Sequence, residues 1–131
     1  MIDVSHEIFT AIATLVREKH SPVHVVGENV NVPAQFPCVA IDEIYNVPSH
    51  LDTADEEAFN AVTYRVQVFC TGEDKRAQAR EIFKTVSDIC WGLNLIRKTY
   101  TTTPTVYNSN IYCISATFEA DVRKDGMIFR R

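Results

Sequence analysis

The chain has 131 residues, of which 46% are hydrophobic, and this suits one domain, residues 1–131, that buries a core without disulfides or metal. Its formal net charge of -4 argues against broad adhesion to nucleic acid, because such binding depends on Lys and Arg side chains that neutralise phosphates, and it leaves a local basic patch open. No stretch approaches the ~18 apolar residues of a membrane span, and the N-terminus lacks a signal-peptide layout, so we expect a soluble protein made in the cytoplasm.

The first 45 residues predict a helix followed by two strands. The helix is expected over residues 4–19, because apolar residues recur there at helical spacing. Ser21-Pro22 ends it, since the residue before a proline disfavours the helical backbone. Short runs of apolar residues then predict one strand over 23–26 and another over 38–45.

Residues 46–60 are polar and acidic. Few apolar side chains occur there, and loops of this length in a compact domain are uncommon and often functional or disordered. We therefore predict a mobile acidic loop that becomes ordered on a partner or a neighbouring subunit. Its candidate interface residues are Leu51, Asp52, Asp55, Glu56 and Glu57.

A half-buried strand and an amphipathic helix are expected next. Apolar and polar residues alternate over 62–70, where only Phe69 interrupts the polar face. The helix is predicted over residues 74–93, where seven apolar positions form an almost unbroken stripe. These positions are Ala79, Ile82, Phe83, Val86, Ile89, Cys90 and Leu93.

The outward face of this second helix carries the only tryptophan. At ~100° per residue, Trp91 projects away from the apolar stripe, on the same side as Arg80 and Lys84. Two interpretations stay open. Either the chain after Gly92 folds over the indole, or the indole contacts a partner, since tryptophan is enriched at interfaces. On the second interpretation Arg80, Lys84 and Trp91 belong to an interface.

The last third of the chain predicts a Thr-rich strand, a turn, a long strand and a hairpin. Residues 112–123 alternate strictly between apolar and polar, which is typical of a strand with one buried face. Asp125-Gly126 is a hairpin-turn dipeptide, so residues 124–131 are expected either to pair with this strand or to lie against a neighbour. The interface candidates in this stub are Ile128, Phe129, Arg130 and Arg131.

These elements predict an α+β fold. Two helices with one apolar stripe each, and at least three strands with one apolar face each, combine most simply as a two-layer sandwich. Both helices would pack on one face of a mainly antiparallel sheet, and the other face would be polar and exposed.

The sequence carries no motif for a catalytic, cofactor or metal site. It has no glycine-rich phosphate loop, no Gly-X-Ser-X-Gly and no His-Glu-X-X-His. His20 and His24 lie four apart, but Pro22 breaks the helix that would align them on a metal. The cysteines are far apart and lie in apolar segments, so we expect four reduced, buried thiols. They are Cys38, Cys70, Cys90 and Cys113.

The order of elements and several short motifs resemble the tail terminator, or tail-completion, proteins of long-tailed phages and prophages. The motifs are Phe36-Pro37-Cys38-Val39-Ala40-Ile41, Tyr64-Arg65-Val66-Gln67-Val68-Phe69 and Ile111-Tyr112. They match positions in a fold rather than a chemical site. Many members carry Arg shortly after the Ile-Tyr pair, where this chain has Cys113 and Ile114.

The resemblance implies a structural virion protein, without catalysis or cofactor, that is assembled in the host cytoplasm and lies at the junction of tail and head. It implies a ring of this protein, usually of six subunits, that caps the tail tube and stops its polymerisation. The implied partners are the tail tube protein and the head connector or head-closure protein. Genomic DNA would pass through without specific binding, and no membrane is involved.

Two alternatives to the tail terminator stay open. One is a head-closure or minor capsid connector component of the same particle. The other is a small cytosolic enzyme that uses a Cys-His pair.

Overall fold

The computed structural model describes residues 3–20, 23–27, 35–51, 57–104 and 110–130. In these ranges the chain forms two helices and six strands. In chain order they are α1 (Ser5–Lys19), β1 (His24–Val26), β2 (Cys38–Leu51), β3 (Glu57–Cys70), α2 (Lys75–Gly92), β4 (Ile96–Pro104), β5 (Tyr112–Arg123) and β6 (Ile128–Phe129).

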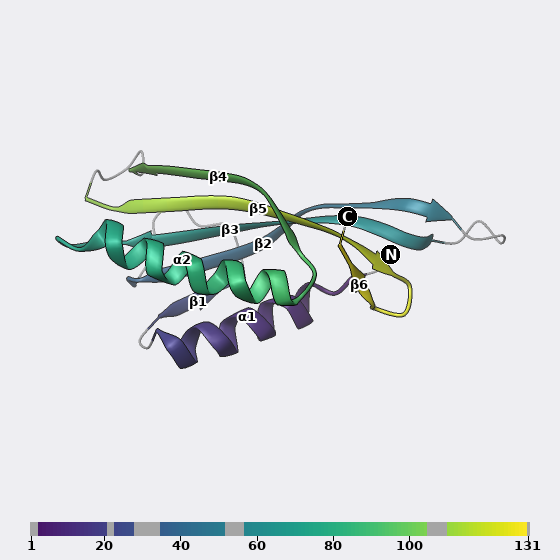
Figure 1. Ribbon diagram of the computed structural model, residues 1–131, viewed down its shortest axis with the longest axis horizontal. Helices are drawn as coiled ribbons and strands as arrows, with labels where there is room; N and C mark the ends of the chain where they lie inside the picture. The colour runs from purple at the N-terminus through teal and green to yellow at the C-terminus, as the bar shows by residue number, and fades with distance from the viewer. Residues whose placement is uncertain (1–2, 21–22, 28–34, 52–56, 105–109, 131) are drawn as a thin grey trace.

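The six strands form one sheet in the order β1-β2-β3-β5-β4, and β6 also pairs with β5. β1 runs parallel to β2, whereas the other neighbouring strands are antiparallel. Both helices lie on the same face of the sheet (Figure 1). The predicted two-layer α+β sandwich is therefore confirmed.

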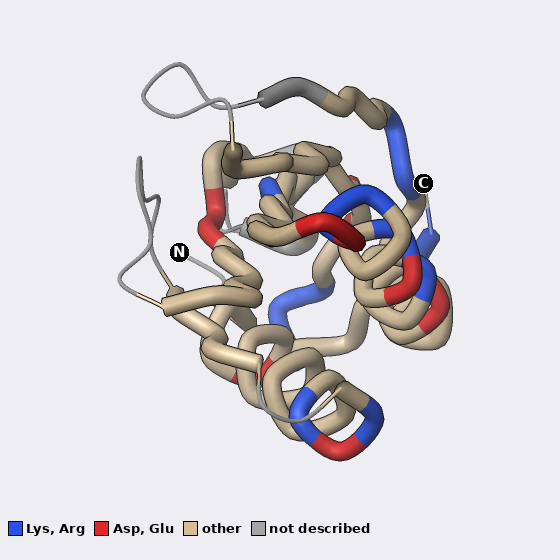
Figure 2. Tube along the Cα trace, turned by 90° about the vertical axis from the view of Figure 1, so that its left-hand side faces the viewer, with Lys and Arg blue, Asp and Glu red and all other residues tan. Residues whose placement is uncertain are grey.

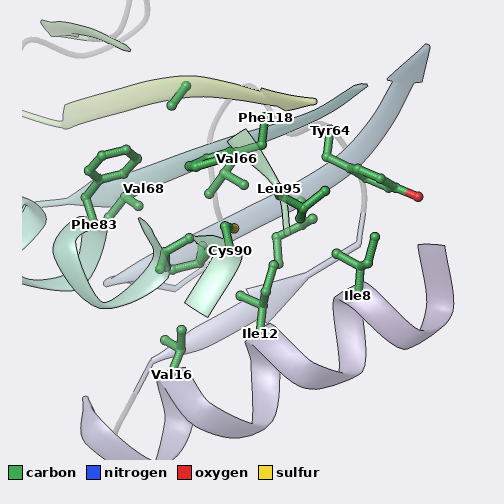
Figure 3. Close-up of a cluster of buried hydrophobic side chains, with 14 of the residues drawn as sticks. Ile8, Ile12, Val16, Tyr64, Val66, Val68, Phe83, Cys90, Leu95 and Phe118 are labelled. Carbon is green, nitrogen blue, oxygen red and sulfur yellow. The ribbon is translucent and has the colours of Figure 1, made fainter. Parts of the chain in front are cut away.

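The core fills the space between the helices and the sheet (Figure 3). Ile8, Ile12 and Val16 point from α1 toward the strands, and α2 contributes residues such as Phe83 and Cys90. The alternating apolar residues of β3 and β5 meet them from the sheet. The helices bury their apolar stripes against these strands. The helical period of 3.6 residues and the strand period of 2 residues in the sequence therefore identify the same core.

The opposite face of the sheet is not polar throughout, which corrects the prediction. Phe69 is buried there, with 2% of its surface exposed, between Cys38 and Cys113 in the strand register. Ala40 and Ile111 complete this second apolar cluster. The residue that interrupted the alternation of β3 is thus the centre of a small second core, covered by chain segments next to the strands.

The predicted acidic loop over residues 46–60 is also wrong in most of its length. β2 continues through Leu51 and β3 begins at Glu57, so only residues 52–56 lie between them, outside the described residues. Strand pairing is sustained by backbone hydrogen bonds, which do not require apolar side chains, and this is why the polar composition misled the prediction.

Neither helix in the described ranges combines the length and the apolar character that a membrane crossing requires.

The second apolar cluster can be tested by truncating its central side chain. We expect Phe69→Ala to lower the free energy of unfolding by about 3–5 kcal/mol, because a buried aromatic ring is replaced by a cavity. Urea denaturation measures this change. Ser115→Ala, on the same face of the sheet, is the control and should change stability by less than about 0.5 kcal/mol. An equally small effect of Phe69→Ala would mean that the ring is not buried.

Candidate interaction surfaces

The clearest candidate is a two-stranded arm, which we define as residues 46–51 of β2 and 57–60 of β3. In Figure 1 the two strands continue past the ends of both helices. The strands stay paired to their ends, where Leu51 lies opposite Glu57. The arm contains the predicted interface residues Leu51 and Glu57, whereas Asp52, Asp55 and Glu56 lie outside the described residues.

A chain of side-chain hydrogen bonds fixes the base of this arm. The hydroxyl of Tyr64 donates to Oε2 of Glu43 at 2.8 Å, and Nδ2 of Asn46 donates to Oε1 of the same carboxylate at 3.0 Å. Asn60, which is fully buried, donates from Nδ2 to Oδ1 of Asn46 at 2.6 Å. Burial, together with the bond to Glu43, raises the pKa of Tyr64, so its hydroxyl keeps the proton that it donates. This network links the core to the arm.

The face of the sheet away from the helices carries exposed apolar side chains near the arm. Tyr45 is 58% exposed and Val47 is 36% exposed, and both alternate with residues that face the helices. Phe59 and Phe129 meet edge to face, with ring centroids 5.9 Å apart. We call these four residues the open-face patch. Its exposure is characteristic of interaction surfaces, because monomeric proteins rarely leave such groups together in water.

The C-terminal stub pairs with the preceding strand, β5, which is the first of the two alternatives predicted from the sequence. Ile128 lies opposite Val122, and Phe129 lies opposite Asp121. The turn between the strands has Gly126 at φ 89°, a backbone conformation that glycine adopts without strain. Next to it the guanidinium of Arg123 binds the carboxylate of Asp125, and this lowers the pKa of Asp125 to about 2. Arg131 lies outside the described residues.

Two hydrogen bonds and one cation–π contact attach this C-terminal hairpin to the end of α2. Nδ2 of Asn94, a residue with a positive φ of 67° just after the helix, donates to the carbonyl oxygen of Ile128 at 2.9 Å. Nη2 of Arg130 donates to the carbonyl oxygen of Trp91 at 2.9 Å. The guanidinium also lies over the indole, 3.8 Å from the ring centroid. Arg130 therefore covers one face of Trp91, and Leu95, Ile96 and Arg97, from the chain that follows Gly92, line a hollow together with the indole.

One flank of α2 presents cations toward solvent beside β4. Arg76, Arg80 and Lys84 recur every four residues and are exposed. Phe83, at the inner border of this flank, contacts Tyr100 of β4 with ring centroids 5.0 Å apart, which places the flank along that strand. Figure 2 looks along the helices and shows charged positions of both signs on their exposed turns.

The cations of this flank continue onto neighbouring elements. We define the cationic strip as Arg76, Arg80, Lys84, Trp91, Arg97 and Arg130. Three of its guanidiniums lie over aromatic rings: Arg76 over Tyr112, Arg97 over Tyr100 and Arg130 over Trp91. Stacking of this kind holds a guanidinium in place and leaves its edge free to bind an anion.

A shallow hollow of about 260 Å³ opens beside Trp91 in the strip. It is lined by Ser87, Trp91, Leu95, Ile96, Arg97 and Phe118. Trp91 itself is 55% exposed. An apolar floor next to two guanidiniums suits a side chain or segment that combines apolar and anionic groups.

The sequence-predicted interface residues thus fall into two groups. Trp91 and Arg130 touch, and Arg80 and Lys84 share their flank, whereas Leu51 and Glu57 lie at the outer end of the arm. Sequence reasoning missed Val47 and Phe59, because their segment was taken as a loop, and it placed Tyr45 at the end of a strand without assigning it to a surface. It also missed Arg76 and Arg97, although the spacing of Arg76, Arg80 and Lys84 is a helical signal that points to a shared flank.

The thiols are buried, as predicted. Burial raises the pKa of Cys38 and Cys113 to about 11 and that of Cys70 and Cys90 to about 12. A thiol with such a pKa is protonated at neutral pH and is a poor nucleophile. In the part of the chain that the structure describes, no three His, Cys, Asp or Glu side chains gather as a metal site.

Comparison of the chain with protein-family models finds no match, and comparison with curated proteins finds none at a significant level.

Trp91 is the residue of the strip whose role is easiest to separate from folding. We expect Trp91→Ala to change the free energy of unfolding by no more than about 1 kcal/mol, because the ring is half exposed and its stacking partner is a surface arginine. The same change should weaken self-association by about 2 kcal/mol, as truncation of a central tryptophan commonly does. Sedimentation at micromolar concentration and thermal unfolding give the two quantities.

Leu15→Ala is the matched control for Trp91→Ala, since Leu15 is an exposed apolar residue of α1. It should leave association unchanged. A large loss of stability in Trp91→Ala, with association at the wild-type level, would show that the indole supports the fold rather than an interface.

Proposed function

We propose that this protein is a structural component of long-tailed phage particles, a tail terminator that forms a ring, expected to contain six subunits, on the end of the tail tube. The ring would stop tube polymerisation and bind the head connector. The proposal combines the sequence resemblance with two features of the fold, the arm and the cationic strip, that lie on the surface of the subunit.

The observation that supports this proposal most directly is the arm. Two paired strands extend past both helices, and the open-face patch next to them leaves Tyr45, Val47 and Phe129 exposed. A segment of this kind contributes little to the core of its own subunit. It gains stabilisation when another surface covers it, at roughly 25 cal/mol for each Å² of apolar surface that is removed from water.

Contacts between different surfaces of neighbouring subunits fit the same proposal. A ring forms when one surface of each subunit binds a different surface of the next and the rotation closes. The arm and the cationic strip differ in shape and charge, which provides two unlike surfaces on each subunit. A net charge of -4 per subunit also suits a ring through which DNA slides, because adhesion to phosphates requires cations facing the DNA.

The proposed role can be tested by shortening the arm. We expect a variant in which residues 49–57 are replaced by Asn-Gly to keep its fold, because the core network at Tyr64, Glu43 and Asn60 remains. The variant should fail to join isolated untailed heads to unterminated tails, whereas the wild-type protein joins them. Electron microscopy counts the joined particles, and circular dichroism checks the fold.

The control for this experiment exchanges Arg17 and Glu18 of α1, which are exposed and lie outside the arm, for Gln, and it should join heads and tails at the wild-type yield. Joining at the wild-type yield by the shortened variant would remove the arm from the proposed contact. Failure of the wild-type protein itself to join heads and tails would contradict the proposed function.

A further inference from the structure

We infer that the hollow beside Trp91 receives the side chain of Tyr45 from a second copy of this chain. The inference rests on the proposed function, because it names one pair of surfaces through which neighbouring subunits of the ring meet.

Tyr45 and Trp91 are the most exposed large apolar side chains in the part of the chain that the structure describes. Tyr45 is 58% exposed and Trp91 is 55% exposed. Tyrosine and tryptophan are enriched among the few interface residues that supply most of the binding free energy, and such residues tend to meet one another across an interface. Each of the two side chains is therefore a candidate anchor.

Tyr45 cannot reach the hollow of its own subunit. It lies opposite Thr63, and the next residue of β3, Tyr64, belongs to the core, so Tyr45 and Thr63 point away from the helices. The hollow is on the other face, because Phe118, which lines it, points into the core beneath the helices (Figure 3). In addition, β3 lies between β2 and β5, which are therefore about 10 Å apart at ~4.8 Å for each spacing. A contact between Tyr45 and the hollow joins two copies.

The hollow has the size and the chemistry that a tyrosine side chain requires. Its volume of about 260 Å³ is below the roughly 300–1,000 Å³ of small-molecule pockets, so it suits a single side chain. Leu95 and Phe118, each 1% exposed, provide an apolar floor, and Ser87 adds a hydroxyl group. The guanidinium of Arg97, another lining residue, already lies over the ring of Tyr100. A tyrosine combines an aromatic ring with a polar tip, which matches an apolar floor bordered by a hydroxyl and a guanidinium.

The contact joins unlike surfaces of the two copies. One copy contributes the face of the sheet away from the helices, where Val47, 36% exposed, extends the surface around Tyr45. The other copy contributes the border between α2 and β4. Because every subunit carries both surfaces, it can bind one neighbour through Tyr45 and another through the hollow. Contacts of this head-to-tail kind close into a ring when the rotation permits it.

Complementation between two variants tests the contact. Tyr45→Thr removes the aromatic anchor, keeps the hollow and retains a residue that favours strands, whereas Trp91→Ala damages the hollow and keeps the anchor. Each variant alone should associate at least about tenfold more weakly than the wild type in sedimentation at micromolar concentration. An equimolar mixture should form dimers and no larger species. The intact hollow of one variant then receives Tyr45 of the other, and no second intact pair remains to extend the assembly.

Two controls accompany this experiment. Tyr45→Phe keeps the aromatic ring and should associate within about threefold of the wild type. Leu15→Ala truncates an exposed apolar side chain of α1, outside both surfaces, and should associate like the wild type.

Association of Tyr45→Thr at the wild-type level, or a mixture that stays monomeric although the wild type assembles, would overturn this inference and leave the proposed ring intact. A wild-type protein that stays monomeric with tail tubes present would overturn the proposed function together with the inference.

Discussion

The architecture depends on a mismatch in length between the strands and the helices that cover them. α2 has 18 residues and is about 27 Å long, whereas β2 and β3 have 14 residues each and extend about 46 Å. Helices of this length can bury only part of the sheet. The residues of β3 from Val62 to Cys70 lie under the helices and are apolar on that face, while the remaining strand ends continue as the arm.

Polar side chains in a hydrogen-bonded network lie at the junction between the part of the sheet that the helices cover and the arm. Tyr64 belongs to the core through its ring, yet its hydroxyl starts the hydrogen-bonded chain through Glu43 and Asn46 to Asn60. Buried polar groups of this kind are costly unless they are paired. Nδ2 of Asn60 is paired, whereas its Oδ1 has no partner among the described residues, so the bond to Asn46 is what favours one orientation of the arm over alternatives. A fixed arm loses less conformational entropy on binding than a flexible loop, which favours its use as a contact.

Much of this fold can be predicted from the sequence because the core strands and helices have strong periodicities. The apolar stripe of α2 and the alternation of β5 locate both elements closely, and Asp125-Gly126 locates the hairpin. The arm could not be predicted, because its stability comes from backbone pairing and from a polar network between distant residues. Phe69 shows the same limitation. An apolar residue on a polar face becomes interpretable only when the segments that cover it are known.

The candidate surfaces were predictable to the extent that they depend on one element. The helical spacing of Arg80, Lys84 and Trp91 puts them on one flank without any tertiary information. The stacking of Arg130 on Trp91 brings together residues 39 positions apart, and no local pattern encodes it. The binding partner of the strip cannot be predicted from these patterns, because they describe how this chain folds and not the surface of a second molecule.

The central claim is that this protein works as an assembly of its own copies. The most direct test is its mass in solution, measured by sedimentation over a range of micromolar concentrations, alone and with isolated tail tubes. The account predicts a closed oligomer, expected to contain six subunits, that forms at least when tubes are present. A protein that remains monomeric under both conditions would contradict the account.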